Sequence, residues 1–298
     1  MSWRTLTAED LEREYSPSSC VGGDIAPFLS EYVRQSQAAR DACAAAGLHV
    51  AHLRYGEAPR QIIHFVRPQA AGPVPLLVFI HGGYWQDLSP GDSFFAAADG
   101  VRHDLAFAAI GYTLAPEASL DEIVAEVMVA LAHLVREAAA LGIDPAQVVV
   151  TGSSAGAHLA AMASIAPTTA AGWRPKAMVL VSGIYELEPL LGTYINDALA
   201  LDLPAAKRNS PVLLPLAGAP RAHIVHGDNE TDEFKRQSAD MHHRLRSVGV
   251  DATLQEIADR NHFDVILDLA RRGEDLGEAV LDLLAAPVNA KEATDAEL

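Results

Sequence analysis

The sequence contains few of the residues that build disulfide frameworks, metal sites or basic surfaces. Only two cysteines, Cys20 and Cys43, occur among its 298 residues. Neither belongs to a CxxC pair or lies beside histidines at metal-ligand spacing, so we expect no disulfide framework and no metal site. Lys and Arg number 22 against 39 Asp and Glu, a formal net charge of -17. This balance disfavours nucleic acid and anionic membranes as partners, because both require a basic surface.

Long apolar segments are also missing. No apolar run is long enough to span a bilayer, and the N-terminal stretch MSWRTLTAEDLEREYSPSS has charges where a signal peptide needs an apolar region. We therefore expect a cytoplasmic protein. Residues 1–285 are expected to form one domain, in which residues 1 to about 55 are a helical segment that packs on or near the active site. The polar, unpatterned residues 286–298 are expected to be a disordered tail.

What the chain does have is an alternation of strand-like and helix-like segments. Short apolar runs predict strands over 61–67, 75–80, 105–112, 147–152, 176–183, 222–227 and 252–258. Helical spacing of apolar residues predicts helices over 119–142, 155–166, 232–247 and 274–285. This order indicates an α/β fold with a mainly parallel sheet covered by helices on both faces. Ligands of such sheets bind beyond the carboxyl ends of the strands.

One of these strand ends carries the pattern G-x-S-x-G. Gly152, Ser154 and Gly156 lie between a predicted strand and a predicted helix of small residues, which is the context of a nucleophile elbow. The spacing suits the chemistry, because the two glycines allow strand and helix to pass closely while Ser154 occupies a strained turn. The N–H of Ala155, at the start of the helix, is a candidate donor to an oxyanion. The alternative is a turn with a structural role only.

A second strand end has the sequence HGGYW. Gly82 and Gly83 can turn their N–H groups toward the oxyanion above Ser154, and Tyr84 and Trp85 are then candidates for the wall of the substrate pocket. Without the elbow, a glycine turn followed by core aromatic residues would be favoured. We expect the preceding histidine, residue 81, to brace this loop rather than to react.

The base and the acid are sought later in the chain, because α/β-hydrolases have the order serine, acid, histidine. His262 follows a late strand in a polar turn and is the candidate base. The segment GDNETDEF offers four acids, Asp228, Glu230, Asp232 and Glu233. Composition alone does not decide which of them pairs with His262.

The chain resembles the kynurenine formamidase (arylformamidase) group of the α/β-hydrolases, close to the hormone-sensitive-lipase-like esterases. The resemblance covers most of residues 11–265 and is carried by segments distributed along that range: LEREYSPS, HGGYW, GYTLAP, GSSAGAHLAAM, LVSGIYELEPL, RNSP, EFKRQS and NHF. It implies a cofactor-free serine hydrolase that acts on a small aryl formamide, ester or related acyl compound.

The resemblance also bears on the acid. Glu230 holds the third position after the strand end at Gly227, and an ungapped match of EFKRQS brings Glu230 onto the family's acid position. We therefore predict a triad of Ser154, Glu230 and His262, with Asp232 as a cap of the following helix. The family commonly has His before the nucleophile and Asp as the acid. Here Ser153, a further candidate pocket residue, and Glu230 stand in those places.

Three functions are compatible with the sequence. The first is an amidase of the arylformamidase type, the second is a carboxylesterase for small acyl or aryl esters, and the third is a hydrolase-fold binding protein without turnover. The intact set of serine, histidine, acids and glycine loop argues against the third. The expected partner is a small-molecule substrate, with a homodimer as a candidate assembly.

Overall fold

The computed structural model describes residues 3–165 and 172–286 of the chain. The described residues form an eight-stranded sheet in the order β1-β2-β4-β3-β5-β6-β7-β8. The strands are β1 (Ala51–Arg54), β2 (Ile62–Val66), β3 (Val74–Ile80), β4 (Ala106–Ile110), β5 (Ile143–Ser153), β6 (Ala177–Val181), β7 (Arg221–Asn229) and β8 (Ala252–Asn261). Pairing is parallel from β4 onward, whereas β1–β2 and β2–β4 are antiparallel. The predicted mainly parallel α/β sheet is confirmed.

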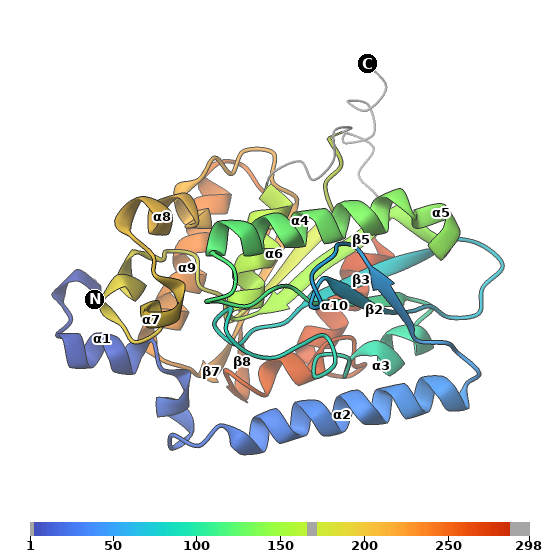
Figure 1. Ribbon diagram of the computed structural model, residues 1–298, viewed down its shortest axis with the longest axis horizontal. Coiled ribbons are helices and arrows are strands. Elements are labelled where there is room, and N and C mark those ends of the chain that lie inside the picture. The colour runs from blue at the N-terminus through green and yellow to red at the C-terminus, as the bar shows by residue number, and fades with distance from the viewer. Residues whose placement is uncertain (1–2, 166–171, 287–298) are drawn as a thin grey trace.

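Helices cover both faces of this sheet (Figure 1). The α-helices are α1 (Ala8–Glu14), α2 (Ala26–Ala45), α3 (Ala97–Arg102), α4 (Leu120–Arg136), α5 (Ala138–Leu141), α6 (Ala155–Ile165), α7 (Asn196–Leu199), α8 (Leu203–Arg208), α9 (Asp232–Ser247) and α10 (Asp275–Ala285). The 3-10 helices are η1 (Trp3–Thr5), η2 (Pro17–Val21), η3 (Glu188–Gly192), η4 (Pro211–Leu213) and η5 (Val265–Asp268).

The sheet separates two apolar cores. Leu76, Val78 and Ile80 of β3 point into the core shared with α4, α6 and α9. Leu77 and Phe79 alternate with them and point into the core shared with α2, α3 and α10. This period of two is the pattern of a strand buried on both faces, and it explains why β3 appears in the sequence as an unbroken apolar run.

Most of the sequence predictions for individual elements agree with the structure. The seven predicted strands are present, but the short edge strand β1 was not predicted. The predicted helix 119–142 is interrupted at Glu137, where α4 ends and the four-residue α5 follows. The start of α4 is fixed by a capping box between Ser119 and Glu122, which is a strong local signal. The predicted tail lies outside the described residues, apart from Ala286.

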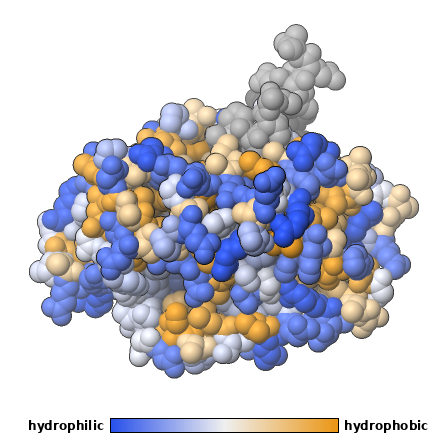
Figure 2. All heavy atoms as spheres, in the orientation of Figure 1, coloured by the Kyte–Doolittle hydropathy of each residue, from blue (hydrophilic) through white to orange (hydrophobic). Residues whose placement is uncertain are grey.

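Hydrophilic side chains cover most of the surface in view, with apolar side chains in separate patches (Figure 2). No helix in the described ranges is both long and apolar enough to cross a membrane. The cytoplasmic location remains a prediction.

Candidate active site

Ser154 occupies a strained turn between the last residue of β5 and the first residue of α6. Its φ is +56°, a left-handed value that side-chain-bearing residues seldom adopt. The flanking glycines are required by close packing. A Cβ on Gly152 would lie 2.2 Å from the carbonyl oxygen of Gly156, and a Cβ on Gly156 would lie 2.0 Å from the carbonyl oxygen of Ile80. Only glycine therefore allows β5, β3 and α6 to approach at this turn.

Hydrogen bonds hold the backbone of this turn on both sides. The N–H of Ser154 donates to the carbonyl of Val181 on β6 at 2.8 Å, and its carbonyl accepts from the N–H groups of Ala157 and His158. Ala155 is the first residue of α6. Its N–H belongs to the first turn of the helix, whose donors have no intrahelical acceptor and carry the positive end of the helix dipole.

The glycine loop that follows β3 lies directly on the elbow. A Cβ on Gly82 would meet the carbonyl oxygen of Ser153 at 2.8 Å and the Cβ of Ser154 at 3.3 Å. Gly83 has a φ of +91°, and its carbonyl accepts from the N–H groups of Gln86 and Asp87 at 2.9 and 3.0 Å. The loop is therefore a tight turn held against Ser154, and both glycines line the cavity described below.

The two aromatic residues of this loop separate. Both have left-handed backbones, with φ values of +50° for Tyr84 and +60° for Trp85. Tyr84 lines the cavity, and its hydroxyl donates to the carbonyl of Tyr15 at 2.5 Å. Trp85 was also predicted to line the cavity, but this prediction is wrong. Its side chain is fully buried in the core and packs edge-on against His158, with ring centroids 5.0 Å apart.

His81 braces the loop, in line with the prediction. Its Nδ1–H donates to the carbonyl of Gly82 at 3.0 Å, and its ring stacks on Tyr112 with centroids 4.2 Å apart. Tyr112 in turn donates to the carbonyl of His81 at 2.9 Å. Burial lowers the pKa of His81 to about 4, so the imidazole is neutral near pH 7 and acts as a hydrogen-bond donor to the loop.

Glu230 is the acid that reaches the histidine. Its Oε2 accepts a hydrogen bond from Nδ1 of His262 at 2.9 Å. Its Oε1 accepts from the Ser182 hydroxyl at 2.6 Å and from the N–H of Gly227 at 2.7 Å. Burial acts to raise the pKa of this carboxyl, but the charge of His262 and the three hydrogen bonds outweigh it, so the pKa of Glu230 lies below its ordinary value.

The other acids of the segment do not contact His262. Asp228 is exposed, and its Oδ1 accepts from the N–H of Arg260. Glu233 is buried but binds the hydroxyl of Tyr15 and the guanidinium of Arg236. The prediction that Asp232 caps α9 is wrong. Thr231 occupies the N-cap position, and Asp232 lies one residue inside the helix, where its charge can still favour the helix dipole.

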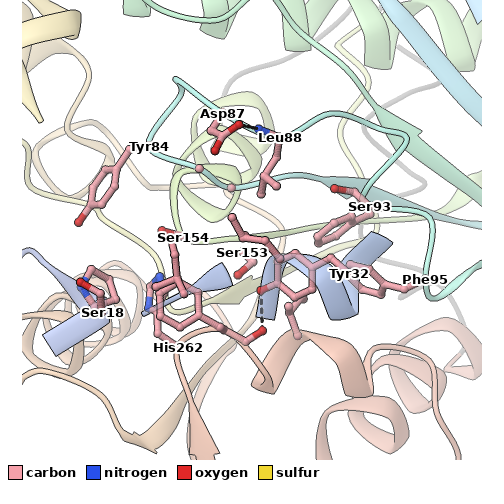
Figure 3. Close-up of a pocket in the computed structure, with 18 of the residues that line it drawn as sticks. Ser18, Tyr32, Tyr84, Asp87, Leu88, Ser93, Phe95, Ser153, Ser154 and His262 are labelled. Atoms are coloured by element: carbon pink, nitrogen blue, oxygen red, sulfur yellow. Dashed lines mark hydrogen bonds between the residues drawn. The ribbon is translucent and has the colours of Figure 1, made fainter. Parts of the chain in front are cut away.

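Ser154 and His262 face one cavity of about 140 Å³ (Figure 3). Ser153 lines it as predicted. The sequence did not identify the lining residues that come from α2, from the segment before it and from the turn and η5 after β8: Pro17, Ser18, Ile25, Leu29, Tyr32, Phe263 and Ile266. These residues belong to segments far from Ser154 along the chain. LEREYSPS includes Pro17 and Ser18, and NHF includes Phe263, but neither motif by itself assigns these residues to a pocket.

Ser182, the partner of Glu230, was also missed. It follows β6 with a left-handed φ of +51° and is fully buried. Two signals were present in the sequence. Ser182 lies at the end of a predicted strand, at the side of the sheet where ligands bind, and within the segment LVSGIYELEPL, but neither signal indicates a contact with Glu230.

A mainly parallel α/β sheet with a serine, an acid and a histidine that each follow the end of a strand, here Ser154, Glu230 and His262, is typical of the α/β hydrolases. Residues 77–265 match the family model described as the α/β hydrolase fold. The match spans more than half of the chain, and the chain belongs to this family. It is a hydrolase with formamidase and esterase homologues.

Particular relatives extend the match over nearly the whole chain. A kynurenine formamidase from Danio rerio is 29% identical over 291 residues, which is 95% of this chain and 98% of the relative. One from Drosophila melanogaster is 27% identical, covering 88% of this chain and 93% of the relative. The structure of a candidate thioesterase from Silicibacter sp. tm1040 is 27% identical with a TM-score of 0.79, covering 91% and 98%. The resemblance inferred from the sequence is confirmed.

Proposed function

We propose that the chain is a cofactor-free serine hydrolase that cleaves small aryl formamides or related amides through an acyl-enzyme. The proposed triad is Ser154, Glu230 and His262. The observation that carries the proposal is the buried hydrogen bond between Glu230 and His262 at the same cavity as the strained Ser154. The amide is favoured over other acyl compounds because the kynurenine formamidases match the chain over nearly its full length.

In the first half of the proposed reaction, the Oγ of Ser154 forms a bond to the acyl carbon while Nε2 of His262 takes the hydroxyl proton. The carbonyl oxygen becomes an oxyanion, for which the N–H groups of Gly82, Gly83 and Ala155 are the proposed donors. Collapse of this intermediate breaks the bond to the leaving amine, which receives the proton from His262. The products of this half are an amine and an acyl-serine.

In the second half, water attacks the acyl carbon and gives a proton to His262. The bond to Oγ then breaks, and the proton returns to Ser154 as the carboxylic acid leaves. Glu230 remains ionised throughout. Its role is to hold the tautomer with hydrogen on Nδ1 and to stabilise the imidazolium, and its lowered pKa is consistent with that state near pH 7.

A second candidate, a carboxylesterase for small acyl or aryl esters, has its own basis. The chain is also 24% identical to an isoprenylcysteine alpha-carbonyl methylesterase from Arabidopsis thaliana over 263 residues. The same serine, histidine and oxyanion donors can cleave an ester. The leaving alcohol or phenol of an ester depends less than an amine on receiving a proton from His262.

The test is to assay the purified chain with N-formylkynurenine and with p-nitrophenyl acetate under the same conditions. We expect the higher kcat/KM for the formamide. Turnover of the ester alone would favour the second candidate. Turnover of neither compound would contradict the proposed hydrolase activity.

A further inference from the structure

The cavity beside Ser154 is lined by one acidic side chain and by no lysine or arginine among the described residues. The acidic side chain is that of Asp87. The remaining lining is mostly aliphatic and aromatic, with hydroxyl groups from several serine and tyrosine residues. An outward substrate group whose only charge is a carboxylate would therefore lose hydration in this cavity without gaining a cationic partner, which is costly. A group that also carries an ammonium brings its own counter-charge.

Asp87 lies at the opening of the cavity, because it lines the cavity and is itself exposed. In Figure 3 it is on the opposite side of Ser154 from His262. Its place is fixed by the glycine loop. Its N–H donates to the carbonyl of Gly83, and its own carbonyl packs so closely on Gly83 that a Cβ there would lie 2.7 Å away. One carboxylate oxygen accepts from the N–H of Leu88 at 2.7 Å.

The size of the cavity limits what can be enclosed. Its volume is about 140 Å³, and an apolar cavity of about 150 Å³ is known to hold benzene. One aromatic ring therefore occupies most of the enclosed space. Any group attached to the ring away from the scissile bond extends toward the opening, where Asp87 lies.

We propose that Asp87 is a specificity-determining residue for acyl substrates that carry a single aromatic ring. It favours substrates whose outward group is cationic over those with a neutral group, and disfavours those with an anionic group. This inference rests on the proposed hydrolase function and specifies its substrate class. The formal net charge of -17 acts in the same direction, because a field of one sign attracts substrates of the opposite charge. The carboxylate of Asp87 supplies the local part of this selection.

The experiment compares three acetate esters of phenol that carry a 3-methylbutyl, a 2-(dimethylamino)ethyl or a 2-carboxyethyl group at the para position. The two-carbon spacer keeps the reactivity of the leaving phenolates similar, and the tertiary amine cannot be acylated. An exposed charge pair changes binding by about threefold in each direction, so we expect kcat/KM for the cationic ester to exceed that for the anionic ester by about tenfold at low salt. High salt should reduce this ratio.

Asp87→Asn is the test variant, because the amide oxygen can still accept from the N–H of Leu88. The ratio of the cationic to the anionic ester should fall by about threefold to tenfold in this variant. A ratio within one variant does not depend on how much of the protein is folded. The matched control is Asp282→Asn, an exposed acid on α10 outside the cavity lining, which should keep both the parent ratio and the parent activity.

Two results would overturn the inference. One is a parent enzyme that hydrolyses the anionic ester as well as the cationic one. The other is an Asp87→Asn variant with the parent ratio. Failure of the parent enzyme to hydrolyse even the neutral ester is a different result, because it contradicts the proposed hydrolase function itself.

Discussion

Replacing Glu230 by Gln turns one carboxylate oxygen into an NH₂ group and keeps the shape of the side chain. The hydrogen bonds determine where that group goes. Oε1 accepts from the Ser182 hydroxyl and from the N–H of Gly227, so the amide oxygen must take this position. The NH₂ group then faces Nδ1 of His262, which lies 2.9 Å from Oε2. Two donors cannot bond to each other, so the imidazole must carry its hydrogen on Nε2.

An imidazole in that tautomer cannot accept the proton of Ser154, and the variant also lacks the charge that stabilises the imidazolium. In serine hydrolases, the corresponding change lowers kcat by about 10⁴ because the tautomer is wrong. We expect Glu230→Gln to lower kcat for p-nitrophenyl acetate by about 10² to 10⁴, toward the upper end because two donors fix the amide orientation. The melting temperature should change little, because the shape and the two hydrogen bonds to Oε1 are retained.

The controls are Asp228→Asn and Asp232→Asn, two exposed acids of the same segment. Each should keep kcat within about tenfold of the parent value. NMR of the imidazole nitrogens reads the tautomer directly and should show hydrogen on Nδ1 in the parent and on Nε2 in Glu230→Gln. A Glu230→Gln variant that keeps more than about a tenth of the parent kcat, or an inactive Asp228→Asn variant, would show that Glu230 is not the acid that orients His262.

Three further predictions concern the loop, acid stability and the acyl group. Gly82→Ala should lower kcat by about 10² or more, because its Cβ would meet the carbonyl of Ser153 at 2.8 Å. Gly72→Ala, where no atom lies within 4 Å, should leave kcat unchanged in the same assay. The pKa values of His81 and His158 are lowered by burial from 6.5 to about 4. The unfolded chain therefore binds more protons than the folded chain between these values, and the free energy of unfolding should fall by up to about 1.4 kcal/mol per pH unit for each imidazole as pH decreases through this window. Urea titrations at pH 7 and 5 measure the fall, and equal stability at both would contradict it. Formyl and acetyl esters should have higher kcat/KM than esters with about eight acyl carbons, and a preference for the long chains would be inconsistent with a cavity of about 140 Å³.

The residues at the strand ends could be predicted from the sequence because their signals are local. Gly152, Ser154 and Gly156 are fixed by contacts within a few residues of each other and with β3, and such constraints appear as a short motif. The acid partner of His262 was harder to predict, because four acids share the segment 228–233. The structure distinguishes them by burial and by reach to His262, and neither property follows from composition.

Other features depend on contacts between distant segments. Tyr84 and Trp85 are adjacent and both large and apolar, yet one faces the cavity and the other the core, because consecutive left-handed residues turn the chain between them. Periodicity rules for regular strands and helices do not describe such a turn. The expectation that residues 1 to about 55 lie on or near the active site did not identify individual side chains, because the lining from Pro17 and Tyr32 depends on how α2 and the preceding η2 pack beside the carboxyl edge of the sheet.

Covalent labelling is the most direct test of the proposed role of Ser154 as the nucleophile. The purified chain is treated with an organophosphate, digested, and examined by mass spectrometry, with Ser153→Ala and Ser154→Ala treated in parallel. We expect one label on Ser154, with loss of activity in proportion to labelling, in the parent and in Ser153→Ala. Labelling at another serine, or undiminished labelling of Ser154→Ala, would contradict it.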